Sequence, residues 1–160
     1  MDKNDLHYLY PGALHVSKEP IFITTVLGSC VSICLWDPIL KYGGMNHFML
    51  PFWNGKGLAS PKYGNIAVEK LVEKMLDLGC KKVNLKAKVF GGGDVINNDS
   101  NMFHIGERNI ELAKDMLLDL SIPILSSSLG GRNGRKIIFQ TDNGVVNHKL
   151  IQNSLRNDEK

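Results

Sequence analysis

The chain has 160 residues, of which 43% are hydrophobic and 22% charged, and its formal net charge at neutral pH is +3. This is the size and composition of one globular domain with a single core. The charge is too small, and too little clustered, for the Lys/Arg stripe that nucleic-acid binding usually needs. We see neither a secretory signal nor an apolar stretch long enough for a bilayer, so we expect a cytoplasmic protein without membrane insertion.

We expect one domain over residues 1–151 and a polar tail over 152–160. Three apolar runs with turn signals between them predict an antiparallel meander in the first third of the chain. These three strands are expected at Ile21–Leu27, Val31–Leu35 and Gly43–Leu50.

Helical periodicity of apolar residues predicts two amphipathic helices later in the chain. The alternation of apolar and polar residues predicts another strand between the helices, and Asp142-Asn143-Gly144 predicts a hairpin turn. In chain order these elements are the helix Tyr63–Leu78, the strand Val83–Phe90, the helix Gly106–Leu120, and the hairpin strands Arg135–Gln140 and Val145–Leu150. Together they indicate an α/β (α+β-like) domain with a layered sheet core and two main helices.

Cys30 follows Gly28-Ser29 at the turn between the first two predicted strands. Backbone N–H groups at such a reversal need not be used by a sheet ladder, and N–H groups beside a nucleophile can stabilise an oxyanion. The N–H groups of Ser29 and Cys30 are therefore candidates for an oxyanion site. A buried structural thiol is the alternative, because free cysteine is among the most buried residue types.

His47 is the candidate base, in an otherwise apolar predicted strand. A histidine near Cys30 is expected to raise the thiolate fraction of Cys30 and make it the most readily alkylated cysteine. A core histidine hydrogen-bonded to backbone carbonyls is the alternative. A third group usually orients such a base, and Thr24 and Thr25 lie upstream on opposite strand faces, so only one of them can point toward the site. Either threonine is otherwise an ordinary strand residue.

The remaining motifs favour structural roles. Cys34 and Cys80 are expected to be reduced thiols that pack in the core. A zinc site is not expected, because Cys-x3-Cys has no second pair and the histidines are scattered. Gly91-Gly92-Gly93 is not followed by Gly-Lys-Ser/Thr, so it predicts a tight loop after a strand and not a phosphate-binding loop. No metal or organic cofactor is expected.

The motifs LGSCVSICLWDP and GGMNHFMLP together resemble the CheD family of chemoreceptor deamidases. The resemblance extends over most of the chain through PKYGNIAVEKLVEKM, KAKVFGGG, IGERNIELAKDML and LGGRNGRKIIFQTDNG. It implies an α/β layered fold similar to deamidating bacterial toxins. It also implies a protein-glutamine glutaminase that converts particular glutamines of methyl-accepting chemoreceptors to glutamates.

The same resemblance implies a catalytic set of Cys30 as nucleophile, His47 as base and Thr24 as the threonine, with a cysteine thioester intermediate. It implies two partners, the cytoplasmic domains of chemoreceptors as substrate and a phosphatase of the CheC type, which acts on the phosphorylated regulator CheY. Two other functions stay open: a binding module that regulates such a phosphatase and has little activity of its own, and a cysteine peptidase or general amidase.

Overall fold

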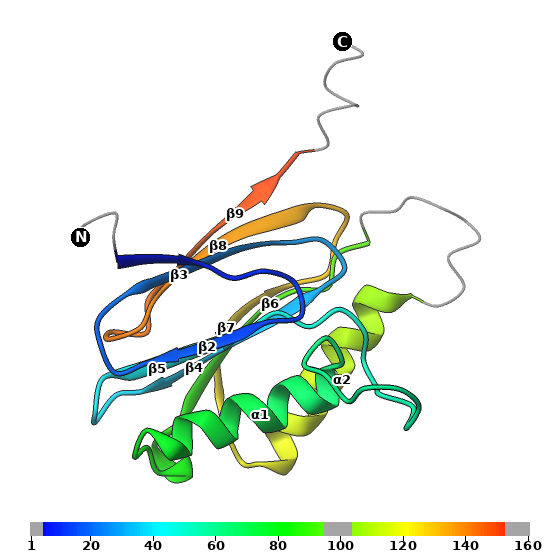
Figure 1. Ribbon diagram of the computed structural model, residues 1–160. Helices are drawn as coiled ribbons and strands as arrows, with labels where there is room; N and C mark the ends of the chain where they lie inside the picture. Colours follow the sequence, from blue (N-terminus) through cyan, green and yellow to red (C-terminus); the bar gives the residue numbers. More distant parts are fainter. Residues whose placement is uncertain (1–4, 95–103, 153–160) are drawn as a thin grey trace.

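Two β-sheets and two helices form three layers in the computed structural model, which describes residues 5–94 and 104–152 (Figure 1). The outer sheet has the strand order β1 (Leu6–Tyr8), β3 (Phe22–Leu27), β8 (Gly134–Gln140), β9 (Val146–Ile151). The central sheet has the order β2 (Leu14–Ser17), β5 (Tyr42–Asn46), β4 (Val31–Asp37), β6 (Lys86–Gly91), β7 (Ile124–Leu129). The helices α1 (Gly64–Asp77) and α2 (Ile105–Asp119) cover the free face of the central sheet.

Successive side chains of β4 point to opposite faces of the central sheet, so the hydrophobic core has two parts, one on each face. Val31, Ile33 and Leu35 point toward the helices, where they belong to a cluster with Leu71 of α1 and Leu117 of α2. The opposite face of β4 and β5 packs against inward side chains of the outer sheet, among them Ile23, Leu27, Ile137 and Phe139. Because β4 is covered on both faces, nearly all of its residues are buried.

The predicted three-stranded meander is wrong at its first strand. β4 and β5 do pair antiparallel, but β3 pairs with β1 and β8 in the outer sheet. The turn at residues 28–30 therefore carries the chain from one sheet to the other. A hairpin and a crossover between packed sheets share the same local pattern of strand, glycine turn and strand, so the pattern does not distinguish them.

The two predicted helices are confirmed, and so is the layered α/β fold with two main helices. The predicted hairpin is confirmed as β8 and β9, which pair antiparallel. The strand predicted from Val83 begins later, because Lys82–Asn84 form a single 3₁₀ turn (η2) before β6. The sequence pattern did not reveal β1, β2 or β7, which are all edge strands and carry few apolar side chains in alternation.

Candidate functional site

The register of β4 and β5 places Cys30 and His47 on the same face of the central sheet. Beyond the last paired strand residues, Val31 and Phe48 form an antiparallel bridge with two N–H···O bonds of 3.1 and 2.9 Å. In this register Cys30 and His47 are diagonal neighbours across the bridge, a position in which Cα atoms are roughly 7–8 Å apart. Both side chains point toward the outer sheet, on the face where Cys34 and Met45 oppose each other.

His47 is buried and held from two directions. Its backbone N–H donates to Ala13 O at 3.2 Å, and its carbonyl accepts from Gly12 N–H at 2.8 Å. Its ring Nδ1 lies 2.8 Å from Thr25 Oγ1, which comes from the outer sheet. The hydroxyl of Thr25 donates its single proton to Leu9 O at 2.7 Å.

This chain of hydrogen bonds determines the tautomer of His47. Because the Thr25 proton goes to Leu9 O, the Thr25 oxygen must accept from the imidazole. Nδ1 of His47 therefore carries a proton, and Nε2 has a free lone pair. A neutral imidazole in this tautomer can remove a proton through Nε2.

The side chain of Thr24 does not contact the imidazole of His47. Its Oγ1 donates to Ile137 O at 2.8 Å, on the neighbouring strand of the outer sheet. Successive side chains of a strand point to opposite faces, and Thr25 shares the inward face with Ile23. The threonine hydroxyl against the imidazole of His47 is therefore that of Thr25, and not that of Thr24, the residue that the family resemblance implies.

Burial keeps both members of the pair neutral. It lowers the pKa of His47 to about 4. It also raises the pKa of the Cys30 thiol, a shift that the backbone N–H of Cys30 partly opposes by hydrogen bonding. The expectation that His47 raises the thiolate fraction of resting Cys30 is therefore wrong. At neutral pH the arrangement is a thiol beside a neutral base, and not a preformed thiolate–imidazolium pair.

The turn before β4 has its carbonyls occupied and leaves two N–H groups available. The three carbonyls of residues 28–30 all accept hydrogen bonds. The donors are Gly93 N–H to Gly28 O at 3.0 Å, Asn109 Nδ2 to Ser29 O at 3.0 Å, and Gly92 N–H to Cys30 O at 2.8 Å. Among the residues that the structure describes, the N–H groups of Ser29 and Cys30 donate to no backbone carbonyl. These are the two N–H groups expected to bind an oxyanion.

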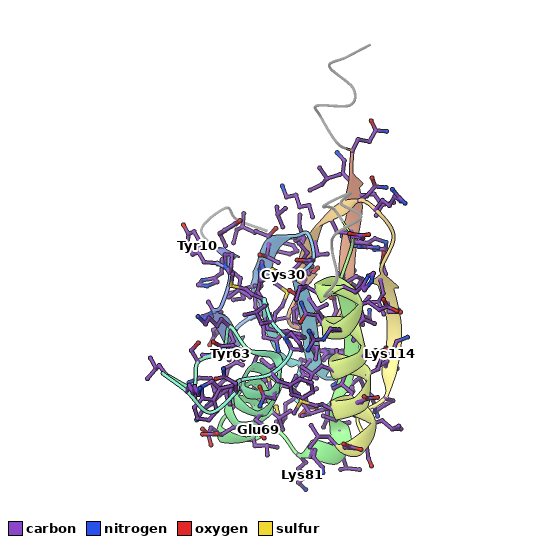
Figure 2. The ribbon with its side chains drawn as sticks, turned by 90° about the vertical axis from the view of Figure 1, so that its right-hand side faces the viewer. Tyr10, Cys30, Tyr63, Glu69, Lys81 and Lys114 are labelled. Atoms are coloured by element: carbon purple, nitrogen blue, oxygen red, sulfur yellow. The ribbon has the colours of Figure 1, made fainter. Side chains whose placement is uncertain are left out.

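Cys30 is the most accessible of the three cysteines. It is half-buried, whereas Cys34 and Cys80 are buried. It lies directly before β4, at the turn from β3, and Figure 2 shows it in the upper part of the view, away from Lys81 at the bottom. Burial raises the pKa of Cys34 strongly, and burial together with Asp37 raises the pKa of Cys80 to about 12. The prediction that Cys34 and Cys80 pack in the core is confirmed.

Within residues 5–94 and 104–152, no group of three His, Cys, Asp or Glu side chains is placed to hold a metal ion. Across the same residues, no helix is long and apolar enough to span a membrane.

Comparisons with known proteins agree with the motifs. Residues 49–150 match the family described as "CheD chemotactic sensory transduction". The chain is 56% identical over 140 residues to "Probable chemoreceptor glutamine deamidase CheD" of Trichlorobacter lovleyi, a match that covers 88% of this chain and 87% of that protein. It is 47% identical over 146 residues to the protein of the same name from Sulfurimonas denitrificans, covering 91% and 94%. Among solved structures, the Bacillus licheniformis hypothetical protein YfiH matches with a TM-score of 0.45 and 16% identity, over 72% of this chain and 49% of that one. The family match and the identity to these relatives show that the chain belongs to the CheD family.

Proposed function

We propose that this protein is a protein-glutamine glutaminase that hydrolyses the side-chain amide of glutamines on methyl-accepting chemoreceptors. Cys30 is the nucleophile and His47 the base. The observation that carries this proposal is the chain from Leu9 O through Thr25 to Nδ1 of His47, which leaves Nε2 unprotonated. Cys30 lies on the same sheet face as this imidazole. The name of the curated relatives supports the substrate class.

Acylation begins when Nε2 of His47 takes the proton of the Cys30 thiol as glutamine binds. Sγ attacks the side-chain carbonyl carbon, and the carbonyl oxygen becomes an oxyanion that accepts hydrogen bonds from the N–H groups of Ser29 and Cys30. The imidazolium of His47 then gives its proton to the amide nitrogen. The C–N bond breaks, ammonia leaves, and the acyl group remains on Cys30 as a thioester.

Deacylation repeats these steps with water as the nucleophile. His47 takes a proton from water, and the hydroxide oxygen attacks the thioester carbonyl carbon. The C–S bond breaks, glutamate is released as the carboxylic acid or its anion, and the sulfur recovers a proton from His47. No redox step occurs, and water is the only co-reactant.

Thr25 acts in this scheme as a neutral orienting group for the imidazole. Its oxygen accepts the Nδ1 proton of His47 and so leaves the lone pair of the ring on Nε2. A hydroxyl stabilises an imidazolium less than a carboxylate does. Burial disfavours the imidazolium further, since it lowers the pKa of His47 to about 4. The imidazolium therefore exists only briefly, between proton transfers.

The proposed substrate is the cytoplasmic part of a chemoreceptor, so the proposed location of the enzyme is the cytoplasm. A glutamine on the surface of a receptor helix must reach Cys30 without entering a deep pocket. The half-buried position of Cys30 at one end of the sheets supports such access. We also propose a phosphatase of the CheC type as a second partner, on the family resemblance alone.

The test is mass spectrometry of a receptor cytoplasmic fragment after incubation with the enzyme. We expect conversion of individual glutamines to glutamates with the wild-type protein and none with Cys30→Ala. Cys34→Ala is the matched control, because Cys34 lies on the same strand face but is fully buried. It should retain activity.

Other outcomes of this assay would support the alternative functions. Shortened receptor fragments or turnover of free glutamine would indicate a peptidase or a general amidase. Unmodified receptor, together with a purified CheC-type phosphatase that binds and changes its rate, would indicate a regulatory module.

A further inference from the structure

Asn109, on α2, holds two carbonyl groups next to the proposed catalytic pair. The side chain is fully buried, and its Nδ2 donates to Ser29 O at 3.0 Å and to Met49 O at 3.1 Å. Ser29 directly precedes Cys30, and Met49 follows His47 by two residues. One side-chain amide of α2 therefore links the turn at residues 28–30, which we call the nucleophile turn, to the segment that contains His47.

The bond to Ser29 O also determines where the next N–H points. The C=O of Ser29 and the N–H of Cys30 belong to one peptide group, which is planar and trans, so the two point in opposite directions. Because the carbonyl points to α2, the N–H of Cys30 points away from α2. The side chains of Cys30 and His47 lie on the face of the central sheet opposite the helices. The N–H of Cys30 is thus directed to the side of the proposed reaction.

The backbone N–H of Cys30 donates to no backbone carbonyl of the described residues, so it is available on that side. The N–H of the next residue, Val31, is already used in a bond to Phe48 O at 3.1 Å.

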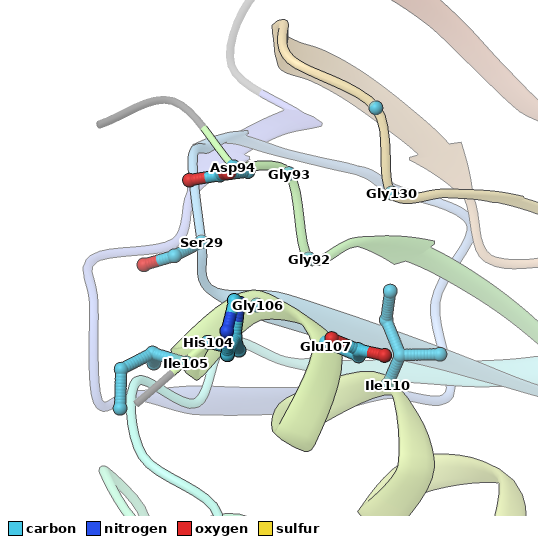
Figure 3. Close-up of a pocket in the computed structure, with 11 residues that line it drawn as sticks. Ser29, Gly92, Gly93, Asp94, His104, Ile105, Gly106, Glu107, Ile110 and Gly130 are labelled. Atoms are coloured by element: carbon cyan, nitrogen blue, oxygen red, sulfur yellow. The ribbon is translucent and has the colours of Figure 1, made fainter. Parts of the chain in front are cut away.

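Close backbone packing brings Asn109 within reach of the turn. Gly106 lies in the first turn of α2, and a Cβ there would collide with Gly92 O and approach Gly93 O to 2.8 Å. Figure 3 shows Gly92 and Gly93 between Ser29, Gly130 and this first turn of α2, around a cavity of about 310 Å³. Asn109 follows Gly106 by nearly one helical turn. The glycines therefore determine how far α2 stands from the nucleophile turn.

We infer that Asn109 is a positioning residue for the oxyanion site, a role that rests on the proposed function. By donating to Ser29 O it orients the peptide whose N–H meets the developing negative charge. It also polarises that peptide, since hydrogen bonds in a chain strengthen one another. Its Oδ1 accepts no hydrogen bond from the described residues. The Nδ2 atom is therefore what this buried amide contributes to the turn.

The test compares two reactions of Cys30 in the full-length protein. Deamidation of a receptor fragment passes through an oxyanion, whereas alkylation by iodoacetamide is a displacement at carbon that forms none. Asn109→Leu keeps the side-chain volume and removes both donated bonds, and Asn109→Ala is a second variant in case the first folds poorly. We expect kcat for deamidation to fall on the order of 10²-fold, with KM and the alkylation rate of Cys30 close to those of the wild type.

Leu117→Val is the matched control, because it loosens the packing of the same helix without touching the turn. All variants are assayed at a temperature at which circular dichroism shows them folded. Unchanged kcat in both Asn109 variants contradicts the inference alone. A fall in kcat matched by the same fall in alkylation, or by the same fall in Leu117→Val, contradicts it as well, because it indicates general loosening. A wild-type protein that deamidates no receptor contradicts the proposed function, and this inference with it.

Discussion

Replacing Thr25 by valine tests whether the imidazole is oriented from the inward face of β3. Valine has nearly the same shape as threonine but can neither accept from Nδ1 of His47 nor donate to Leu9 O. Both of these groups become buried without a partner. Each buried polar group left without a partner costs about 1–3 kcal/mol, so the loss of both should lower the free energy of unfolding by about 2–6 kcal/mol.

Activity should fall as well, because the ring loses its orientation and its preference for the Nδ1–H tautomer. If the hydrogen bond between Thr25 and His47 stabilises the transition state by about 2–3 kcal/mol, its removal lowers kcat on the order of 10²-fold. Receptor deamidation measured by mass spectrometry gives kcat, and urea denaturation gives the stability. Thr25→Ser retains a hydroxyl and should recover most of the activity.

Thr24→Val is the matched control on the opposite face of the same strand. It removes one hydrogen bond, to Ile137 O, and should lower stability by about 1 kcal/mol. Its kcat should stay close to that of the wild type. Loss of activity in Thr24→Val with full activity in Thr25→Val would refute the tautomer argument.

Three further predictions concern pH, thiol reactivity and the turn. The pKa of His47 is lowered from 6.5 to about 4, so the unfolded state binds the proton more tightly, and stability is lost as pH falls below 6.5. The His47 contribution to this loss should be about 2 kcal/mol at pH 5, so urea denaturation at pH 7 and 5 should show a smaller acid destabilisation for His47→Gln. An equal loss in both proteins would disprove the shift. Iodoacetamide should label Cys30 before the two buried cysteines in peptide mapping, at a rate that rises with pH beyond the ordinary thiol range because the pKa of Cys30 is raised; earlier labelling of a buried cysteine would contradict its placement. Gly91→Ala should destabilise the protein more than Gly79→Ala. Both glycines have a positive φ (112° and 110°), but only a Cβ at Gly91 would collide with Cys30 O. Equal losses in the free energy of unfolding, measured by urea denaturation, would argue against that contact.

The local sequence was sufficient to predict the two helices, the β8–β9 hairpin and the layered α/β fold class. Amphipathic periodicity and the turn Asp142-Asn143-Gly144 are signals within a few residues, and the structure follows them. The assignment of β3 to the meander failed, because pairing partners far apart in the chain decide which sheet a strand joins. β3 pairs with β8, more than a hundred residues later.

At the candidate site, too, local sequence predicted some features and long-range packing decided others. The motif around Cys30 and the histidine at position 47 were sufficient to identify the family and to select these two residues as candidates. Alternation showed that Thr24 and Thr25 point to opposite faces, but which face is inward depends on the packing of β3 against the central sheet. Asn109 carried no signal in the chain, because its partners Ser29 and Met49 are distant in sequence.

Residue type made the thiol and the imidazole candidates for nucleophile and base, since this chemistry belongs to the side chains themselves, and the resemblance of the motifs selected the two residues. Only the tertiary structure decided which threonine meets the imidazole, which tautomer the imidazole takes and how burial shifts the pKa values. Each of these depends on atoms from separate strands and helices that meet only when the two sheets and α2 pack together.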